Sequence, residues 1–281
     1  MPYNFIPEIA HAKLLEDREK AAIAVKHCNR EYEGDIKSKG DRVKILTPGE
    51  VSLFEYTRNA DMSDPEIIDD AAQYLDITES QAFQYYLDDV DKKQMDKASA
   101  FEKSTMRNAA YKISDYADSF VYKLYSEMVQ DTTFSSFDSA DVLTLLAAAD
   151  KAMRLANVPE SETKYLEISP DVYAKFVLAD IAKDTDNSKV LETGLVKKLW
   201  SMNIYVSNNI VTTGTTVGST SYCIVRTNKA VAYAEQINQS ESLRHPKRFG
   251  DIHRGLFLCG AKLIVPKEAV CFKVITAAES A

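Results

Sequence analysis

The most regular hydrophobic pattern in the chain is a stripe that steps by threes and fours along residues 106–128. Its members are Met106, Ala110, Ile113, Ala117, Phe120, Leu124 and Met128. This spacing places them on one face of an α-helix. Asp91 followed by Gln94 resembles a capping box, so we predict one helix from Asp91 to Met128. At ~1.5 Å per residue it would be about 55 Å long, which suits an extended molecule.

Before this helix, apolar and polar residues alternate. The first of three predicted strands has two apolar residues on one face and two basic residues on the other: Val43 and Ile45 against Arg42 and Lys44. Pro48-Gly49 predicts a turn, and Val51–Tyr56 and Ala72–Leu87 predict further strands. Such a ribbon has little core of its own. We therefore expect it to pack elsewhere, for example on neighbouring subunits. Residues 8–30 predict a loose helix.

After residue 132 the pattern is that of a mixed α/β region. Asp138 or Ser139 is placed to cap a helix that Pro159 ends, with a buried face made of Val142, Leu145, Leu146, Ala149, Met153 and Leu155. Tyr165–Ile168 predicts a short strand. Ser169-Pro170 then opens another helix, with proline at its first position.

The C-terminal third predicts strands. Asn203–Val211 and Tyr222–Arg226 form a predicted hairpin around a turn rich in Gly, Thr and Ser. Lys229–Ile237 fits either a helix or a strand. Phe249–Ile275 alternates as strands, with predicted interruptions at Gly260 and Pro266.

Composition places the chain among ordinary globular proteins. Its 281 residues, 45% hydrophobic and 27% charged, predict one or two compact units made in a cytoplasm. No apolar run approaches the ~20 residues of a membrane span, and the first residues lack the pattern of a secretory signal. Four widely spaced cysteines favour buried free thiols over disulfides: Cys28, Cys223, Cys259 and Cys271.

The net charge of −8 is unevenly distributed. Residues 59–91, the acidic stretch, hold ten acids and no Lys or Arg. Residues 244–254, the basic cluster, hold four Lys or Arg and two His. The two attract each other within or between copies, or are simply solvated surfaces. The candidate contacts between subunits are Asp61, Asp64, Asp69, Asp70, Arg244, Lys247, Arg248 and Arg254. The basic cluster is too short and too poor in aromatic residues for a specific nucleic-acid site.

No motif in the sequence predicts catalysis, a cofactor or a metal. Asp88–Asp91 offers carboxylates for Mg²⁺ or Ca²⁺, but a strand end meeting a helix N-terminus explains them better. Asp184–Ser188 fits a turn. His245 and His253 are spaced wrongly for a zinc helix and are expected at the surface or an interface. Gly214–Gly218 lacks the Lys and helix of a phosphate loop and predicts a hairpin tip.

Several segments, in order, resemble tailed-bacteriophage major capsid proteins with the Hong Kong 97-type fold, in the branch similar to the coat protein of podovirus P-twenty-two. The segments are Asn4–Ile9, Asn29–Gly34, Lys39–Ile45, Leu87–Lys92, Ile168–Pro170, Ile204–Asn209, Ala230–Gln236 and Gly255–Lys262. Each is weak alone, and their joint occurrence carries the resemblance.

The resemblance implies an α+β Hong Kong 97-type capsid fold. It assigns an N-terminal arm, an extended β-hairpin loop, a spine helix of the peripheral domain, an α/β axial domain and final strands that complete the peripheral domain. The corresponding ranges are 1–34, 35–90, 91–131, 132–247 and 248–281.

It also implies a role: a non-enzymatic shell subunit of the virion, assembled in the host bacterial cytoplasm. The implied partners are further copies in pentamers and hexamers, a separate scaffolding protein, a portal protein and non-specifically bound double-stranded DNA. Some relatives crosslink subunits through lysine, and Lys39 and Lys44 lie in the extended loop. The alternatives are a nanocompartment shell of the same fold and, more remotely, a metal-dependent hydrolase that uses the aspartates or His245 and His253.

Overall fold

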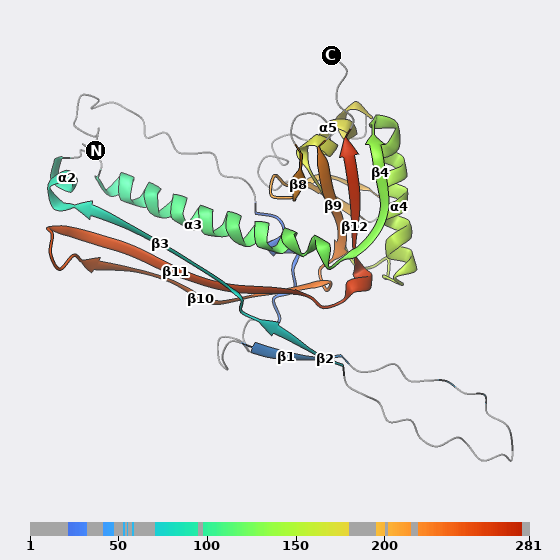
Figure 1. Cartoon of the computed structure of the whole chain (residues 1–281), viewed down its shortest axis with the longest axis horizontal. Coiled ribbons are helices and arrows are strands. Elements are labelled where there is room, and N and C mark those ends of the chain that lie inside the picture. The colour runs from blue at the N-terminus through green and yellow to red at the C-terminus, as the bar shows by residue number, and fades with distance from the viewer. Residues whose placement is uncertain are drawn as a thin grey trace.

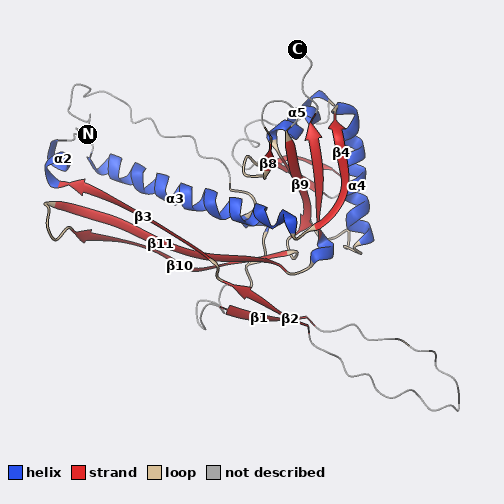
Figure 2. Ribbon diagram, in the orientation of Figure 1, coloured by secondary structure: helices blue, strands red, loops and turns tan. Residues whose placement is uncertain are grey.

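The computed structural model describes residues 22–32, 42–47, 53, 55, 58, 71–94, 98–179, 195–199, 202–214 and 219–276. The described chain forms an elongated molecule with a sheet and a long helix at one end and a larger sheet with two helices at the other (Figure 1). Helices and strands contribute to both ends (Figure 2). Within the described residues, no helix is both long and apolar enough to cross a membrane.

A three-stranded antiparallel sheet forms the long end of the molecule, in the order β10 (Val231–Arg244), β11 (Gly250–Leu263) and β3 (Glu79–Asp88). Helix α3 (Ala98–Lys123) runs along this sheet (Figure 1). Their shared core is apolar, and its aromatic members are Tyr122, Tyr233 and Phe257. Lys229–Ile237, which was ambiguous from sequence, is therefore strand from Val231 onward.

The long helix is shorter than predicted. The Asp88 carboxylate accepts the N–H of Val90 (2.8 Å) and so caps α2 (Asp89–Gln94). The capping box at Asp91 is therefore wrong, because Asp91 lies inside α2. Residues 95–97 are not described, and the 26 residues of α3 span ~39 Å. The last turn tightens to a 3₁₀ helix, Leu124–Ser126.

The predicted apolar stripe holds in the second half of α3 and beyond. Ala117, Leu124 and Met128 are buried, and Ile113 and Phe120 pack against the same core. Met106 is half-buried and Ala110 is exposed. The stripe is therefore buried only in the second half of α3 and just beyond it, where the three-stranded sheet and the N-terminal segment pack against it.

A seven-stranded mixed sheet forms the other end, in the order β4-β12-β9-β5-β7-β6 with β8 beside β9. The strands are β4 (Val129–Phe137), β12 (Ala269–Thr276), β9 (Thr220–Thr227), β5 (Lys164–Ile168), β7 (Met202–Val206), β6 (Leu195–Leu199) and β8 (Thr212–Thr213). Helices α4 (Val142–Leu155) and α5 (Pro170–Leu178) lie against it (Figure 1). Its core includes the predicted apolar face of α4 from Val142 to Met153, while Leu155 is exposed.

The caps of these two helices follow the sequence. Asp138 forms a capping box ahead of α4 through a 3₁₀ turn, Ser139–Asp141, and Ser169 caps α5. However, α4 ends at Leu155, before Pro159. Asn157 adopts a left-handed φ of 58°, and the N–H of Val158 donates to the carbonyl of Met153 (3.1 Å). This hydrogen bond closes the end of the helix, which lies four residues before the proline.

Two predictions about the C-terminal strands are wrong. Strand β7 does not pair with β9, because its neighbours are β5 and β6; only the short β8 forms a hairpin with β9. Gly260 does not interrupt a strand, because β11 runs through it. A Cβ added at Gly260 would lie 2.1 Å from the carbonyl oxygen of Asp76. The glycine is thus required where the chain between β2 and β3 crosses β11. The interruption at Pro266 is confirmed by a 3₁₀ turn, Pro266–Glu268.

A small sheet of β1 (Arg42–Thr47) and β2 (Ala71–Asp76) confirms the predicted alternation. Val43 and Ile45 are buried, whereas Arg42 and Lys44 are exposed. The buried face packs on residues of the same chain, Ala232 and Ala234 of β10. This part of the ribbon therefore does not need a neighbouring subunit for its core. The predicted turn and strand at 48–56 fall largely outside the described residues, as do residues 8–21 of the predicted N-terminal helix.

The sheets divide the chain differently from the five ranges predicted by sequence. Strand β10 falls in the range 132–247, but it pairs with β11 in the three-stranded sheet. Strand β12 falls in 248–281, but it pairs with β4 and β9 in the seven-stranded sheet. The chain therefore crosses between the two ends of the molecule before β10 and again before β12.

Candidate assembly site

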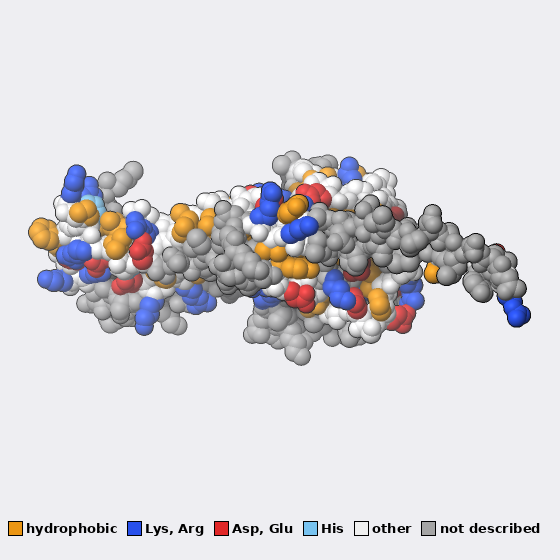
Figure 3. Space-filling model, turned by 90° about the horizontal axis from the view of Figure 1, so that it is seen from below, with side chains coloured by type: hydrophobic (Ala, Val, Ile, Leu, Met, Phe, Trp, Pro, Cys, Tyr) orange, Lys and Arg blue, Asp and Glu red, His pale blue; other side chains and the backbone are white. Residues whose placement is uncertain are grey.

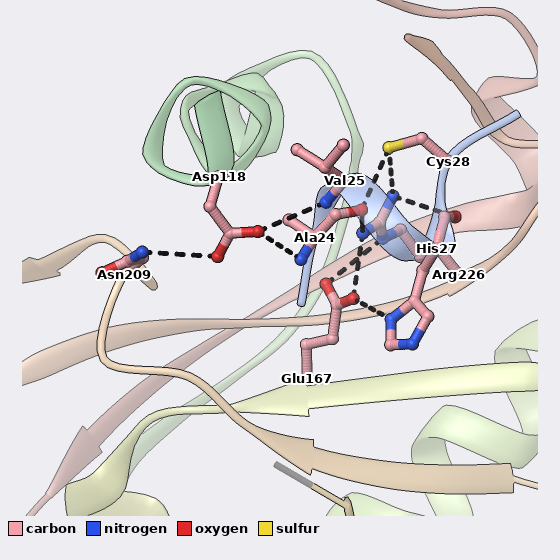
Figure 4. Close-up of polar contacts among 8 residues, drawn as sticks. All are labelled: Ala24, Val25, His27, Cys28, Asp118, Glu167, Asn209 and Arg226. Atoms are coloured by element: carbon pink, nitrogen blue, oxygen red, sulfur yellow. Dashed lines mark hydrogen bonds and ion pairs between the residues drawn. The ribbon is translucent and has the colours of Figure 1, made fainter. Parts of the chain in front are cut away.

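Residues 22–32 lie where α3 and the two larger sheets meet (Figure 1). The N–H of Asn29 donates to the carbonyl of Val231 (2.8 Å), and the N–H of Tyr233 donates to the carbonyl of Asn29 (2.9 Å). A short 3₁₀ turn, Val25–His27, precedes this contact. Four charged or titratable side chains lie in or around the turn, and we call them the junction network: His27, Asp118, Glu167 and Arg226 (Figure 4).

The centre of the junction network is a buried ion pair between Arg226 of β9 and Glu167 of β5. The two residues are 1% and 0% exposed. Arg226 donates from Nη2 to Oε1 (2.9 Å) and from Nε to Oε2 (3.2 Å) of Glu167. Nδ1 of His27 lies 2.8 Å from Oε1. Burial alone would raise the pKa of Glu167, but the charge of Arg226 and the hydrogen bonds of His27 and Arg226 lower it below its ordinary value. Glu167 therefore stays ionised.

Arg226 uses its remaining donors to hold the N-terminal segment. Nη2 donates to the carbonyl of Ala24 (2.8 Å). Nη1 donates to the carbonyl of His27 (3.4 Å) and to Sγ of Cys28 (3.2 Å). The rings of Tyr165 and His27 stack with centroids 4.0 Å apart. The turn is thus fixed to the seven-stranded sheet by charge-assisted hydrogen bonds in a buried setting.

Asp118 of α3 holds the same turn from the other side (Figure 4). Its Oδ1 accepts the N–H groups of Ala24 (2.6 Å) and Val25 (3.3 Å). Asn209, in the loop after β7, donates to its Oδ2 (3.4 Å). The junction network therefore ties three parts together: the long helix, the seven-stranded sheet and the N-terminal segment.

The carboxyl of Asp118 makes the stability of the subunit depend on pH. Burial, and then the charge of Glu167, raise its pKa from 3.8 to about 6. The folded protein binds this proton more tightly than the unfolded chain does, so the free energy of unfolding decreases as the pH rises between these two pKa values. Once the carboxyl is fully ionised, the total loss is about 3 kcal/mol. Between pH 5 and pH 7.5 the wild type should lose about 1.4 kcal/mol relative to Asp118→Asn, which does not titrate. Urea unfolding of both proteins at both pH values measures this, and a difference independent of pH would contradict it.

Half of the sequence-predicted contact residues lie in the described chain. Asp61, Asp64, Asp69 and Asp70 are outside the described residues. Arg244 forms ion pairs with Asp89 and Asp251 of the same chain, and Arg254 pairs with Glu241. One end of the acidic stretch thus contacts the basic cluster within the chain. The predicted contacts between subunits remain a hypothesis.

Lys247 and Arg248 differ from the two arginines. Both lie exposed in the turn between β10 and β11, at the far end of the three-stranded sheet. At this end of the molecule basic, hydrophobic and histidine side chains gather on the surface (Figure 3). These two cations are therefore the members of the basic cluster that remain available to a partner.

The candidate metal and cation residues have structural roles. Asp88 caps α2 and also accepts the hydroxyl of Tyr86 (2.8 Å). His253 is 5% exposed, stacks on Tyr85 and contacts Glu102 (3.1 Å), so its expected surface position is wrong. His245 is half-buried. Among the described residues, no group of three His, Cys, Asp or Glu side chains is arranged to hold a metal ion.

Other sequence candidates are placed in part. All four cysteines are free and buried, as predicted, and burial raises the pKa of Cys223 and Cys271 to about 12. Lys44 is exposed on β1, whereas Lys39 lies outside the described residues. Gly214 has a φ of 105°, which favours glycine. Residues 184–188 and 215–218 are not described.

The junction network was missed at the level of sequence. Its signal was present: Glu167 and Arg226 are charged residues that directly follow the apolar runs Tyr165–Leu166 and Tyr222–Val225. Asp118 directly follows Ala117 of the predicted stripe. Charges at such positions are unusual unless they are paired. Their partners come from segments 59 to 202 residues apart, so no local pattern connects them.

Comparison with known proteins gives structural matches only. No protein-family model matches the chain, and no curated protein matches it. A solved structure from Mycobacterium phage Che8 matches with a TM-score of 0.77 and 26% identity over 96% of this chain and 97% of that chain. The capsid structure of cyanophage P-SCSP1u matches with a TM-score of 0.72 and 16% identity, over 98% of this chain and 94% of that chain. A virus-like particle from Pyrococcus furiosus matches with a TM-score of 0.53 and 16% identity, over 88% of this chain and 90% of that chain.

These matches span nearly the whole chain and nearly the whole of each matched chain. The protein therefore has the fold of tailed-bacteriophage capsid proteins. Both the α+β fold class and the resemblance to phage capsid proteins, predicted from sequence, are confirmed.

Proposed function

We propose that this chain is the major capsid protein of a tailed bacteriophage, a non-enzymatic shell subunit. The observation that carries the proposal is the end-to-end match with phage structures at TM-scores of 0.77 and 0.72. Because neither chain has a large unmatched part, the likeness concerns the whole subunit rather than one shared module. Copies would associate into pentamers and hexamers and close into a shell with icosahedral symmetry.

The domain roles form part of the proposal, with boundaries that differ from the predicted ranges for the loop and for β3, β10 and β12. The extended loop would be residues 35–78, and the peripheral domain would comprise α2, α3, β3, β10 and β11. The axial domain would comprise β4 to β9 with α4, α5 and β12, following the pairing of the strands. A separate scaffolding protein, a portal protein and non-specifically bound double-stranded DNA would be its partners in the host cytoplasm and the virion.

The alternatives have less support. A nanocompartment shell is expected to share the fold. However, the virus-like particle matches with a TM-score of 0.53, well below the TM-scores of the two phage structures. A metal-dependent hydrolase would need available ligands. His253 is buried against Tyr85 and Glu102, and Asp89 and Asp251 are bound by Arg244. These groups serve the packing of the subunit.

Assembly can be tested directly. The full chain, expressed alone and with a candidate scaffolding protein, should form closed shells visible by electron microscopy. Particles filled with genomic DNA in infected cells would support the phage role, whereas small particles containing cargo enzymes would favour the nanocompartment. Absence of shells under both conditions would contradict the proposal. A stoichiometric metal ion in the purified protein would instead support the alternative of a metal-dependent hydrolase.

A further inference from the structure

Residues 22–29, which we call the latch segment, are held by buried polar groups from two sides (Figure 4). On one side, Oδ1 of Asp118 on α3 accepts the N–H groups of Ala24 and Val25. On the other side, Arg226 of β9 donates to the carbonyl of Ala24 (2.8 Å). The same residue is thus bound through its N–H to the long helix and through its carbonyl to the seven-stranded sheet. The latch segment therefore ties these two parts of the molecule together.

The groups around the latch segment do not balance in charge. Two buried carboxylates, Asp118 and Glu167, lie near a single buried guanidinium, that of Arg226. The imidazole of His27 adds a hydrogen bond to Glu167. Burial raises the pKa of the Cys28 thiol, which stays neutral. With both carboxylates ionised and the imidazole neutral, these groups carry one excess negative charge away from water, which is costly. One bound proton would cancel that charge.

Asp118 is the group placed to bind this proton, because Arg226 and His27 keep Glu167 ionised. Burial, and then the charge of Glu167, raise the pKa of Asp118 to about 6, although its hydrogen bonds with backbone N–H groups and with Asn209 oppose the shift. The titratable and charged groups around this carboxyl come from every element that packs there: His27 of the latch segment, Glu167 of β5, Arg226 of β9, and Asp115 and Tyr122 of α3.

The latch segment itself contributes to the burial of this carboxyl. The backbone nitrogen of Ala24 lies 2.6 Å from Oδ1 of Asp118, and Ala24 belongs to the core that covers the second half of α3. Removing the segment would let water reach the carboxyl and would return its pKa toward 3.8. Because docking of the segment raises this pKa, a proton on the carboxyl must favour docking to the same extent.

We propose that the latch segment is a proton-sensitive latch: a protonated Asp118 keeps residues 22–29 docked, and ionisation of Asp118 favours their release. The proton passes to solvent, and no covalent bond of the chain changes. Release removes a tie between α3 and the seven-stranded sheet while both keep their own cores. The device belongs to the single subunit, so it stands or fails independently of the proposed shell function.

Hydrogen exchange of the full chain, measured by mass spectrometry, tests the latch. Exchange in the latch segment reports its release, because several of its N–H groups are hydrogen-bonded: those of Ala24, Val25, His27, Cys28 and Asn29. After correction for the intrinsic effect of pH on exchange, release should be about tenfold more frequent at pH 7.5 than at pH 5, for a pKa that returns to 3.8 on release. A frequency that does not change with pH would overturn the proposal.

Peptides from α4 in the same samples distinguish release from global unfolding. The latch segment should exchange at least tenfold faster than α4. Low concentrations of urea should leave its exchange unchanged, because release exposes little surface. Equal rates for the two regions, both rising with urea, would overturn the latch, because the pH effect would then reflect unfolding of the whole subunit.

Three variants identify the group that binds the proton. Asp118→Asn does not titrate and should remove the pH dependence of exchange, whereas His27→Gln and Asp115→Asn should keep it. Asp115 is the matched control, because it lies about one turn earlier on α3 and accepts a hydrogen bond from the same Asn209 (2.7 Å). Should Asp118→Asn not fold, Asp118→Ser is a second variant without a titrating group. A pH dependence that is lost in His27→Gln and kept in the Asp118 variants would overturn Asp118 as the sensor.

Discussion

Replacing Glu167 by leucine should destabilise the subunit by about 3–5 kcal/mol, because the substitution leaves the guanidinium of Arg226 buried without its counter-ion. Arg226 is 1% exposed, and its remaining acceptors are carbonyls and one sulfur atom. Chemical unfolding at pH 7.5 measures the loss. Limited proteolysis should also cut residues 22–29 faster, since Arg226 holds that segment.

The double substitution distinguishes a buried-charge penalty from simple loss of packing. Glu167→Leu combined with Arg226→Met removes both charges, so it should be more stable than Glu167→Leu alone. Glu162→Leu is the matched control, because Glu162 pairs with exposed Lys229 near the surface (2.5 Å). That control should leave the unfolding midpoint unchanged. A double variant less stable than the single variant would show that packing, and not the unpaired charge, dominates.

Local patterns predicted most of the elements, because each depends on a few neighbouring residues. The alternation around Val43 and Ile45 set the faces of β1, and Asp138 and Ser169 capped the helices they precede. The helix ends were less accurate, because the caps that decide them are single hydrogen bonds. Asp88, rather than Asp91, caps α2 by accepting the N–H of Val90.

Pairing between distant strands was the part that sequence could not supply. Strand β7 has the pattern of a hairpin partner for β9, yet β5 lies between them. A strand that is buried on both faces carries no periodic signal for its neighbours. The same limit hid the junction network, whose ion pair joins β5 to β9.

The turn between β10 and β11 shows how the structure refined a hypothesis drawn from charge. The sequence grouped Arg244, Lys247, Arg248 and Arg254 as equivalent. The structure separates them, because the arginines at 244 and 254 serve ion pairs within the chain. Phe249, which sequence reasoning passed over, became prominent only through its exposure.

Replacing Gly260 by alanine should cost about 3 kcal/mol or more, because the new methyl group would meet backbone rather than a side chain. Its Cβ would lie 2.1 Å from the carbonyl oxygen of Asp76 and 3.1 Å from Cα of Ile77. The chain between β2 and β3 would have to move away from β11. Since β2 belongs to the proposed extended loop, particle yield should fall together with stability. Chemical unfolding and particle yield measure the two effects.

Gly255→Ala on the same strand is the matched comparison. The three atoms nearest to its Cβ would all belong to the ring of Phe83, with Cε1 at 2.1 Å, and that side chain is half-buried. A side chain at this position can change rotamer at a cost of about 1 kcal/mol, so this variant should remain close to wild type. The contrast between the two substitutions isolates the crossing at Asp76 from general intolerance of side chains on β11. Equal losses from both would mean that the close approach of the backbone at Gly260 is not what requires glycine there.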